Sequence, residues 1–403
     1  MKRKMKTIAL VLAWIMAFTL FTGCTGGGEG QVSSAVNEAP DASMAAESTA
    51  APENTDTSGA DAEGELGKEG LDTLTFVFPR SYELLDDAQI HVAFAMGYFE
   101  ENGIDLQLET AMGVDDLKML VSGQADVALP SSFVQIAGHE AELPFISVYQ
   151  QDNVNIFGYC VAPDSGITSI ADLAGKSITL GDPAWSTISD PILIAAGVDP
   201  SEVEYVTAGE NRAQLVEAGQ ADAVLTWYKE FNLWQAQGME LDWLAGEDVV
   251  QLQGSSLCFA TDQIEAKKDI IGRFLKAYAM GSYFTYLNPA AATEITLERF
   301  PSIQVEFADA MKAVEALVYI ENGDDVAQNG YGWHNPAKWE AQMKACKAAG
   351  TLTRDDLTLE EIYTNDFVEV TNDFDHKSVE EDAANYQLKT ENQPYALTNP
   401  PRS

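Results

Sequence analysis

A short pattern that occurs twice constrains the fold more than any other feature of the chain. Residues 120–129 read L-V-S-G-Q-A-D-V-A-L, and residues 215–225 read L-V-E-A-G-Q-A-D-A-V-L. In each copy an amphipathic helix ends at a glycine, which tolerates the left-handed conformation after a helix, and a short apolar strand follows. One copy would fit a helix–turn–strand unit of any α/β protein. Two copies predict two similar lobes, each an α/β unit.

The residues after each strand indicate where a ligand would bind. The first copy runs into Pro130, Ser131, Ser132 and Phe133, and the second into Thr226, Trp227, Tyr228 and Lys229. Ligands of open α/β sheets bind at the carboxyl ends of the strands. The sequence therefore predicts a site that is lined by small hydroxyls and large aromatic side chains.

Length and charge limit the class of protein. The 403 residues are enough for two lobes of ordinary domain size, and 46% of them are apolar, which allows a packed core. The formal net charge of −40 argues against nucleic-acid binding, which needs clustered Lys and Arg. It also repels anionic lipid, so any attachment to a membrane would need a covalent or apolar anchor.

Neither the cysteines nor the histidines form a metal-binding pattern. Cys160 and Cys258 lie in apolar, strand-like runs, Cys346 lies in a helical pattern, and no metal or redox spacing relates them. We interpret the three as buried thiols, with a disulfide between two of them as the alternative. The four histidines are scattered, and we expect neither a metal nor a cofactor.

The N-terminus has the features of a lipoprotein signal. Basic residues at the start precede an apolar run at 8–21, which is too short for a comfortable membrane span. The run ends at Gly23 and Cys24. This junction resembles bacterial lipoprotein signals, in which the cysteine is lipidated and becomes the first residue of the mature chain. Residues 1–23 are therefore predicted to be the signal peptide; an ordinary secretory signal with an incidental cysteine is the alternative.

Residues 24–70 are predicted to be an acidic, disordered tether. They are rich in Gly, Ala, Ser, Thr, Pro, Asp and Glu, and such a composition cannot bury enough apolar surface to fold. A tether of about 45 residues has an r.m.s. reach of roughly 35–40 Å. Removal of the signal peptide deletes four positive charges and no acids, so the mature charge would be −40 − 4 = −44. We expect a folded body tethered to the extracytoplasmic face of the cell membrane.

The folded body begins near Leu71 and alternates strands with helices, which predicts an α/β fold in two lobes. The expected strands are 74–78, 104–108, 145–148, 156–162, 177–180, 203–206 and 256–260. The expected helices are 89–101, 114–122, one from Ser132, a short one at 169–173, one that ends at Ala196, one at 210–217 and a long one at 267–287. The remainder is expected to be mostly helical, with loops at 322–333 and 363–367.

Two polar segments, 149–155 and 248–254, are expected to be the crossings between the lobes. Lobe 1 would then comprise residues 71–152 and 255–345, and lobe 2 residues 153–254. Residues 346–403 would form a C-terminal segment that packs on lobe 1.

Several runs together resemble one family. They are G-Y-F-E-E-N-G-I-D-L at 97–106, the two G-Q-A-D turns, G-I-T-S-I-A-D-L-A-G-K-S-I at 166–178, A-G-V-D-P at 196–200, G-W-H-N-P at 332–336 and T-N-D-F-V at 364–368. In this order they are similar to the solute-binding proteins of ABC importers for sulfonates, nitrate and thiamine-pyrimidine precursors, the SsuA/THI5-like or NMT1 group. The resemblance covers residues 74–368.

The resemblance implies a type II periplasmic-binding-protein fold, in which two α/β lobes joined by two crossings close around a ligand. A helical C-terminal extension would complete it. The protein would act as a monomeric receptor, not as an enzyme, and would deliver a small molecule to an ABC permease and its ATPase. The pyrimidine synthase of this group has a Cys-rich run, which this chain lacks. Besides the receptor and the enzyme, a third possible function is a tethered sensor or adhesion module, which would not need a closing cleft.

The candidates for ligand contact follow strands, open helices or lie in the first crossing. They are Arg80, Ser81, Tyr82, Ser131, Ser132, Asn153, Trp185, Ser186, Thr187, Glu210, Trp227 and Tyr228. The structural alternatives are helix capping for the serines, dipole stabilisation for the glutamate, a surface ion pair for the arginine and core packing for the aromatics.

The chemistry of these candidates predicts a class of ligand. Aromatic faces favour flat heterocycles or cations. A sulfonate pocket would want more Arg or Lys, although helix N-termini can also hold an anion. We therefore predict a flat, neutral or weakly cationic nitrogen heterocycle, such as a pyrimidine or a related vitamin precursor. A sulfonate or nitrate is the alternative.

Overall fold

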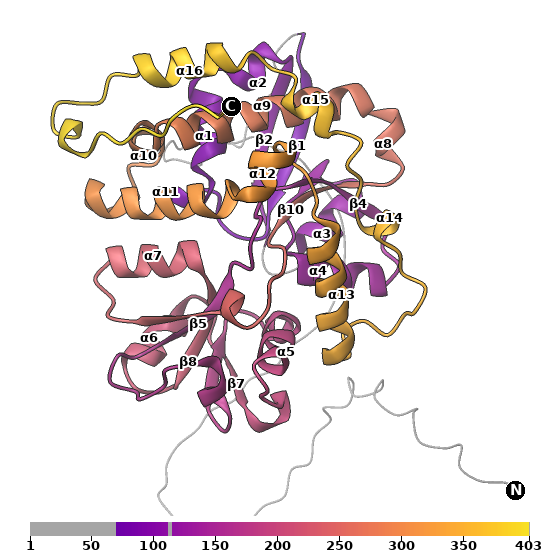
Figure 1. Cartoon of the computed structure of the whole chain (residues 1–403), viewed down its shortest axis with the longest axis vertical. Helices are drawn as coiled ribbons and strands as arrows, with labels where there is room; N and C mark the ends of the chain where they lie inside the picture. Colours follow the sequence, from indigo (N-terminus) through magenta and orange to yellow (C-terminus); the bar gives the residue numbers. More distant parts are fainter. Residues whose placement is uncertain (1–69, 112–114, 403) are drawn as a thin grey trace, which may run out of the picture. The chain divides into compact units, whose positions relative to one another are not determined.

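Two five-stranded sheets divide the folded body into two lobes (Figure 1). The computed structural model describes residues 70–111 and 115–402. The predicted signal peptide at 1–23, the lipidation site Cys24 and the tether up to residue 69 lie outside the described residues. No helix within the described ranges is long and apolar enough to cross a membrane.

The sheet of lobe 1 has the strand order β2-β1-β3-β10-β4. The strand β1 (Asp72–Phe78) pairs in parallel with β2 (Ile104–Thr110) on one side and β3 (Val127–Ala128) on the other. The strand β10 (Ser256–Ala260) is antiparallel to β3 and to β4 (Phe145–Gln150). Because β10 follows lobe 2 in the sequence, the chain returns to lobe 1 after completing the second sheet.

The sheet of lobe 2 repeats this arrangement with the order β7-β6-β8-β5-β9. The strand β6 (Ser177–Leu180) is parallel to β7 (Glu204–Thr207) and β8 (Ala223–Trp227). The strand β5 (Phe157–Val161) is antiparallel to β8 and to β9 (Asp242–Ala245). Each sheet thus has three parallel strands followed by two alternating ones, which confirms the prediction of two similar lobes.

The remaining elements are helical. They are α1 (Ala88–Ala95), α2 (Tyr98–Glu101), α3 (Asp115–Val121), α4 (Ser132–Glu140), α5 (Ser186–Ala195), α6 (Arg212–Glu217), α7 (Tyr228–Ala236), α8 (Gln263–Ala266), α9 (Lys268–Leu287), α10 (Pro289–Arg299), α11 (Phe307–Glu321), α12 (Asp324–Asn329), α13 (Pro336–Ala349), α14 (Leu359–Ile362), α15 (Val368–Asn372) and α16 (His376–Asn385). Short 3₁₀ segments include η1 (Leu85–Asp87) and η3 (Pro183–Trp185).

The aspartate of the repeated G-Q-A-D turn has the same structural role in both lobes. The Oδ2 atom of Asp126 accepts a hydrogen bond from the Thr75 amide of β1 at 2.9 Å. The Oδ2 atom of Asp222 accepts one from the Ser177 amide of β6, also at 2.9 Å. Each carboxylate precedes one strand and joins it to its parallel neighbour. The motif therefore stabilises the sheets at the end of the strands that is opposite to the predicted ligand site.

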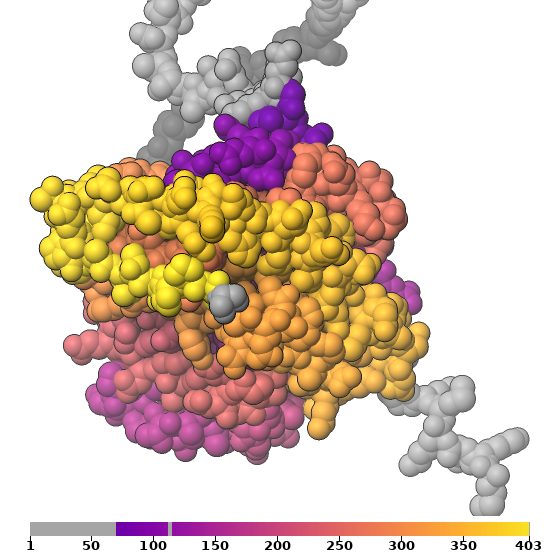
Figure 2. All heavy atoms as spheres, turned by 45° about the horizontal axis from the view of Figure 1, so that its top comes forward, coloured from indigo at the N-terminus to yellow at the C-terminus, as the bar shows by residue number. Residues whose placement is uncertain are grey.

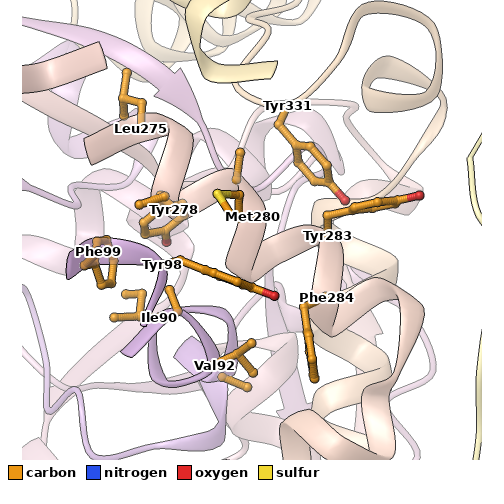
Figure 3. Close-up of a cluster of buried hydrophobic side chains, with 14 of the residues drawn as sticks. Ile90, Val92, Tyr98, Phe99, Leu275, Tyr278, Met280, Tyr283, Phe284 and Tyr331 are labelled. Atoms are coloured by element: carbon orange, nitrogen blue, oxygen red, sulfur yellow. The ribbon is translucent and has the colours of Figure 1, made fainter. Parts of the chain in front are cut away.

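The core of lobe 1 is built around α9 (Figure 3). Ile90 of α1 and Phe99 of α2 belong to the same buried cluster as Tyr278 and Phe284 of α9. A Cβ atom at Gly281 of α9 would lie 2.2 Å from the Gln89 carbonyl oxygen, so α1 and α9 can only approach this closely at a glycine. The same cluster contains Phe76 of β1 and Val127 of β3, so this core packs on these two inner strands.

The C-terminal helices contact both lobes. Helices α15 and α16 pack against α9 of lobe 1, and Figure 2 shows the C-terminal residues, in yellow, spread over one face. Helix α13 packs instead against α5 of lobe 2 and α4 of lobe 1. Its fully buried Trp339 lies in one apolar cluster with Ile192 of α5 and Ile136 of α4. Helices α15 and α16 thus lie against lobe 1, whereas Cys346 lies in the cluster shared with lobe 2; the assignment of 346–403 as one segment on lobe 1 stays a prediction.

Several predicted elements differ from the structure. The helix expected at 89–101 is two helices, α1 and α2, because Gly97 adopts a φ of 79° between them. The loop expected at 322–333 contains the helix α12. Residues 149 and 150 belong to β4, so the first crossing is shorter than predicted. The strand β9 and the helix α7 are absent from the prediction. The three cysteines are free and buried, as predicted.

Candidate ligand cavity between the lobes

A cavity lies between the two lobes, at the C-terminal ends of β1, β3 and β8. The cavity is partly open to solvent, and its empty volume, with that open solvent included, is about 690 Å³. The residues that line it come from both lobes: Pro79, Arg80, Asp116, Pro130, Ser131, Val134, Asp152, Ile156, Phe157, Trp185, Ile188, Leu225, Thr226, Trp227, Lys229 and Ser255.

Four of the predicted contact residues line this cavity, namely Arg80, Ser131, Trp185 and Trp227. The structure thus brings together the residues that follow β1, β3 and β8 and the loop before α5. Ser131 also accepts a hydrogen bond from the Val134 amide as the cap of α4, at 3.4 Å, so the capping alternative holds for it as well. Ligand contact by these four remains a prediction.

The other eight candidates do not line the cavity: Ser81, Tyr82, Ser132, Asn153, Ser186, Thr187, Glu210 and Tyr228. Two of them are buried in polar contacts between segments. The Ser132 hydroxyl donates to the Gln253 carbonyl oxygen at 2.8 Å, and the Asn153 side-chain Nδ2 atom donates to the Glu321 carbonyl oxygen at 3.1 Å. Both contacts hold the crossings against their neighbours.

The rest of these eight have local roles. The Thr187 hydroxyl donates to the Ala184 carbonyl oxygen at 2.8 Å, in the first turn of α5, which begins at Ser186. The Tyr228 ring packs against Phe231 of α7 and Trp243 of β9.

Ser81, Tyr82 and Glu210 lie outside the cavity for equally local reasons. The Ser81 hydroxyl accepts a hydrogen bond from the Glu83 amide at 3.2 Å. The Tyr82 ring packs against Phe78. Glu210 is exposed in the segment before α6. A residue that follows a strand in the sequence therefore does not necessarily line the cavity.

Two indole rings from lobe 2 form one wall of the cavity. Trp185 and Trp227 meet edge to face, with ring centroids 6.1 Å apart and an interplanar angle of 74°. The buried guanidinium of Arg212 lies 5.1 Å from the first centroid and 5.6 Å from the second. Arg212 in turn forms an ion pair with Glu230, in which its Nη2 atom contacts both carboxylate oxygens. These cation–π contacts hold both rings in place before a ligand arrives.

Both cationic side chains that line the cavity are paired with carboxylates. The Arg80 Nη2 atom donates to Asp87 Oδ1 at 3.1 Å. Burial lowers the pKa of Arg80, but Asp87 and Asp86 outweigh burial and raise it above its ordinary value. The Lys229 Nζ atom lies 3.6 Å from Asp152 Oδ1. An anionic ligand would therefore compete with these carboxylates for every cation in the described lining.

The two lobes are in direct contact beside the cavity. The Trp227 Nε1 atom, from lobe 2, donates to Asp86 Oδ2 of η1 in lobe 1 at 2.7 Å. Lys229 Nζ donates to the Asp86 carbonyl oxygen at 3.2 Å. Helix α7 of lobe 2 also packs against α11 of lobe 1 (Figure 1). The same indole thus lines the cavity and bridges the lobes.

The two crossings run side by side where the lobes join. The Gly254 amide donates to the Asp152 carbonyl oxygen and the Asp152 amide to the Ser255 carbonyl oxygen, both at 3.0 Å. A Cβ atom at Gly254 would lie 2.4 Å from the Asp152 Cβ, so only glycine allows this approach. The two backbone segments that connect the lobes are therefore hydrogen-bonded to each other, and the Asp152 side chain lines the cavity.

Two lining residues are adjacent in the sequence to residues that were predicted to contact the ligand. Lys229 and Asp152 line the cavity, whereas their predicted neighbours Tyr228 and Asn153 do not. Which neighbour faces inward depends on the backbone direction at a strand end, and the residue pattern does not reveal it.

Asp116 of α3 is missed entirely. It lines the cavity, its side chain is fully buried, and neither carboxylate oxygen has a hydrogen-bond partner among the described residues. Burial raises the pKa of its carboxyl to about 7. A pair of aspartates at the start of a helix is typical of an exposed N-terminus, so the sequence carries no signal of this burial.

Comparison with known proteins identifies relatives over most of the folded body. The Riboflavin-binding protein RibY of Chloroflexus aurantiacus is 23% identical over 295 residues, which is 70% of this chain and 82% of the relative. The Formylaminopyrimidine-binding protein of Halalkalibacterium halodurans is 24% identical over 264 residues, 62% of this chain and 79% of the relative. A 4-amino-5-hydroxymethyl-2-methylpyrimidine phosphate synthase of Legionella pneumophila is 26% identical over 227 residues, 53% and 70% respectively.

A solved structure shares the fold. The alkanesulfonate-binding protein SsuA from Xanthomonas axonopodis pv. citri, bound to MOPS, aligns with a TM-score of 0.57 at 14% identity and covers 72% of this chain and 98% of its own. The predicted two-lobed fold of a type II periplasmic binding protein is thereby confirmed. The sequence model described as NMT1/THI5 like matches residues 86–292, half of the chain, from η1 through lobe 2 into α10. The protein therefore belongs to the NMT1/THI5-like family.

Proposed function

We propose that this protein is the extracytoplasmic solute-binding component of an ABC importer. It captures a small organic molecule between its lobes and delivers it to a membrane permease and its ATPase. The observation that carries this proposal is the cavity between the lobes, lined by Trp185 and Trp227 and adjoined by the Trp227–Asp86 contact. The names of two relatives, which are binding proteins for riboflavin and for formylaminopyrimidine, support it.

The lining favours a flat, neutral or weakly cationic nitrogen heterocycle. The indole rings offer faces on which such a molecule can stack. The cations Arg80 and Lys229 are already paired with Asp87 and Asp152, which disfavours an anion. The second candidate is a sulfonate or nitrate; the alkanesulfonate-binding structure favours it, and the Ser131 hydroxyl in the lining could serve an anion.

Binding without chemistry fits the described cavity better than catalysis does. One relative is named a synthase, so the enzyme alternative has a specific observation behind it. However, neither a histidine nor a cysteine is among the described lining residues. Cys160 and Cys258 are buried elsewhere, and burial raises the pKa of both thiols well above the ordinary value. Among the described lining residues, no hydroxyl is hydrogen-bonded to a lysine or carboxylate of the lining, as an activated nucleophile in covalent catalysis would need.

Ligand binding is expected to make the protein more compact, because the hinge closes when both lobes contact one molecule. The test is small-angle scattering of the mature protein, first stripped of bound molecules by unfolding and refolding and then resaturated with the molecule that was released. A smaller radius of gyration in the saturated sample supports the receptor. Identical profiles would instead favour a rigid sensor or adhesion module.

We also propose that a lipid on Cys24 holds the protein to the extracytoplasmic face of the membrane, where it acts as a monomer. The support is the sequence alone: basic residues, an apolar run at 8–21 and the Gly23-Cys24 junction. Bacterial cells fed labelled palmitate are expected to label the wild-type chain and not the Cys24→Ala variant. An unlabelled wild type, or equal label in both, would contradict the anchor.

A further inference from the structure

We propose that Asp116 is the hydrogen-bond acceptor for the ligand, and that it selects a ligand whose edge carries N–H donors, as in an amidine or an amino-substituted nitrogen heterocycle. A sulfonate or another anion would be rejected by the same carboxylate. This inference rests on the proposed function, because it assigns the recognition chemistry of the same cavity. None of the residue patterns in the sequence singles out Asp116.

The carboxylate is buried without a partner, which is rare in folded proteins. Asp116 has 0% of its surface exposed, and neither Oδ1 nor Oδ2 makes a hydrogen bond of ordinary geometry with a described residue. The amides of Asp116 and Leu117 lie close enough to lower the pKa of the carboxyl, but burial outweighs them. More than nine in ten buried polar groups find a partner, since an unmet one costs the full desolvation of the group. A carboxylate kept in this state beside a cavity indicates that the missing donors belong to the molecule that fills it.

Among the residues that the structure describes around Asp116, no positive charge is free to pair with it. Helix α3 packs against β1, β3 and β10, and the group that β10 brings close to the carboxylate is the buried thiol of Cys258. Asp115 on the same helix is a like charge, paired with Lys118. The cations of the cavity lining are paired with other carboxylates, as described above.

The rest of the lining is suited to a flat molecule that carries such donors. An amidine presents two parallel N–H groups, which match the two oxygens of a carboxylate and form a strong bidentate contact. Its ring plane would then be free to meet the indoles of Trp185 and Trp227, which belong to the opposite lobe. A ligand held in this way contacts both lobes, as hinge closure requires.

The test compares two probes that differ only in the recognised group: benzamidine, a flat cation with two N–H donors, and benzenesulfonate, a flat anion on the same ring. Calorimetry on the stripped mature protein at pH 8 is expected to detect benzamidine and not benzenesulfonate. The Asp116→Asn substitution is expected to weaken benzamidine binding by roughly 10- to 150-fold, the usual effect of losing a charge-assisted hydrogen bond. Asp115→Asn, which changes the exposed neighbour, is the matched control and should leave the affinity unchanged.

Two pH readouts separate a binding role from a structural one. Because the carboxyl pKa is about 7, wild-type affinity for benzamidine should fall from pH 8 to pH 6, whereas Asp116→Asn should bind it equally at both. This folded-state pKa lies above the ordinary value of about 3.9, so the folded state binds the proton more tightly than the unfolded state does. The stability that this difference contributes is fully present below pH 4 and is lost as the pH rises through 7. The empty Asp116→Asn protein should therefore melt at a higher temperature than wild type at pH 8, with no such gain at pH 4.

The outcomes distinguish this inference from the function beneath it. Tighter binding of benzenesulfonate, or unchanged benzamidine affinity in a folded Asp116→Asn protein, would overturn the assignment. A wild-type protein that binds neither probe, but becomes compact with its own released molecule, would also overturn the assignment while the receptor function stands. A lower melting temperature of Asp116→Asn at both pH values would make Asp116 a structural residue.

Discussion

Replacing Arg212 by alanine is expected to lower the free energy of unfolding by about 3–5 kcal/mol, because it leaves a buried carboxylate without its partner. The Arg212 side chain is only 2% exposed, and its Nη2 atom contacts both oxygens of Glu230. One of these oxygens also accepts a hydrogen bond from the Thr226 hydroxyl, in the cavity lining. The substitution therefore removes the centre of a polar network that lies against the ligand site.

The same substitution is expected to weaken ligand binding. The Arg212 guanidinium lies 5.1–5.6 Å from the ring centroids of Trp185, Trp227 and Trp234. Its loss removes the contacts that fix the orientation of the two indole rings in the cavity lining. Chemical denaturation measures the stability change. The double variant Arg212→Met with Glu230→Leu is the matched control and should be less destabilised than Arg212→Ala, since no charge is left buried. A loss of stability below about 1 kcal/mol for Arg212→Ala would contradict the account of this pair.

Replacing Trp227 by alanine is expected to weaken ligand binding more than it weakens the fold. Stacking of a flat molecule on an aromatic ring contributes about 1–3 kcal/mol by analogy with nucleic-acid bases, so affinity should fall by roughly 5- to 150-fold. Truncation of a fully buried core tryptophan would cost about 3–5 kcal/mol of stability. Trp227 is only half-buried, so the empty variant should lose less. Melting of the empty protein and affinity for the released molecule, both measured on the same variant, separate the two effects.

Two further variants assign the contribution of Trp227. Trp227→Phe keeps an aromatic face and loses the Nε1 donor to Asp86, so it should retain more affinity than the alanine variant while lacking the bridge between the lobes. Trp185→Ala combined with Trp227→Ala reports whether both rings touch one ligand, since contacts to a shared molecule are not additive. If the single alanine variants melt early yet bind normally once the folded fraction is considered, both rings are structural.

The two-lobed fold could be predicted because the pattern that marks each lobe is local in the sequence and occurs twice. A helix, a glycine, an aspartate and a strand follow one another in each G-Q-A-D copy, and Asp126 and Asp222 join the same pair of strands in each sheet. By contrast, β9 forms because β5 is there to pair with it, and α7 because α11 covers it. The contact of α13 with both lobes likewise depends on residues far apart in the chain, which a local pattern does not encode.

The sequence was sufficient to predict where the candidate site lies, but not which individual side chains line it. The rule that ligands bind at strand ends pointed to Arg80, Ser131 and Trp227, which the structure brings to one cavity. At two places the sequence neighbour of a predicted residue lines the cavity instead, namely Lys229 beside Tyr228 and Asp152 beside Asn153. Asp116 could not be predicted, because a buried carboxylate and an exposed carboxylate at the start of a helix have the same residue pattern.

Native mass spectrometry of the purified mature protein tests the central claim most directly. We expect the wild-type protein to carry one small molecule, which is released on unfolding and whose mass fits an aromatic nitrogen heterocycle with N–H donors. The Trp227→Ala variant, purified in the same way and folded, should carry little or none of it. Two results would contradict a ligand site between the lobes. One is a wild-type protein that carries no small molecule even after incubation with an extract of the cells and medium in which it was produced. The other is a Trp227→Ala variant that retains the molecule fully.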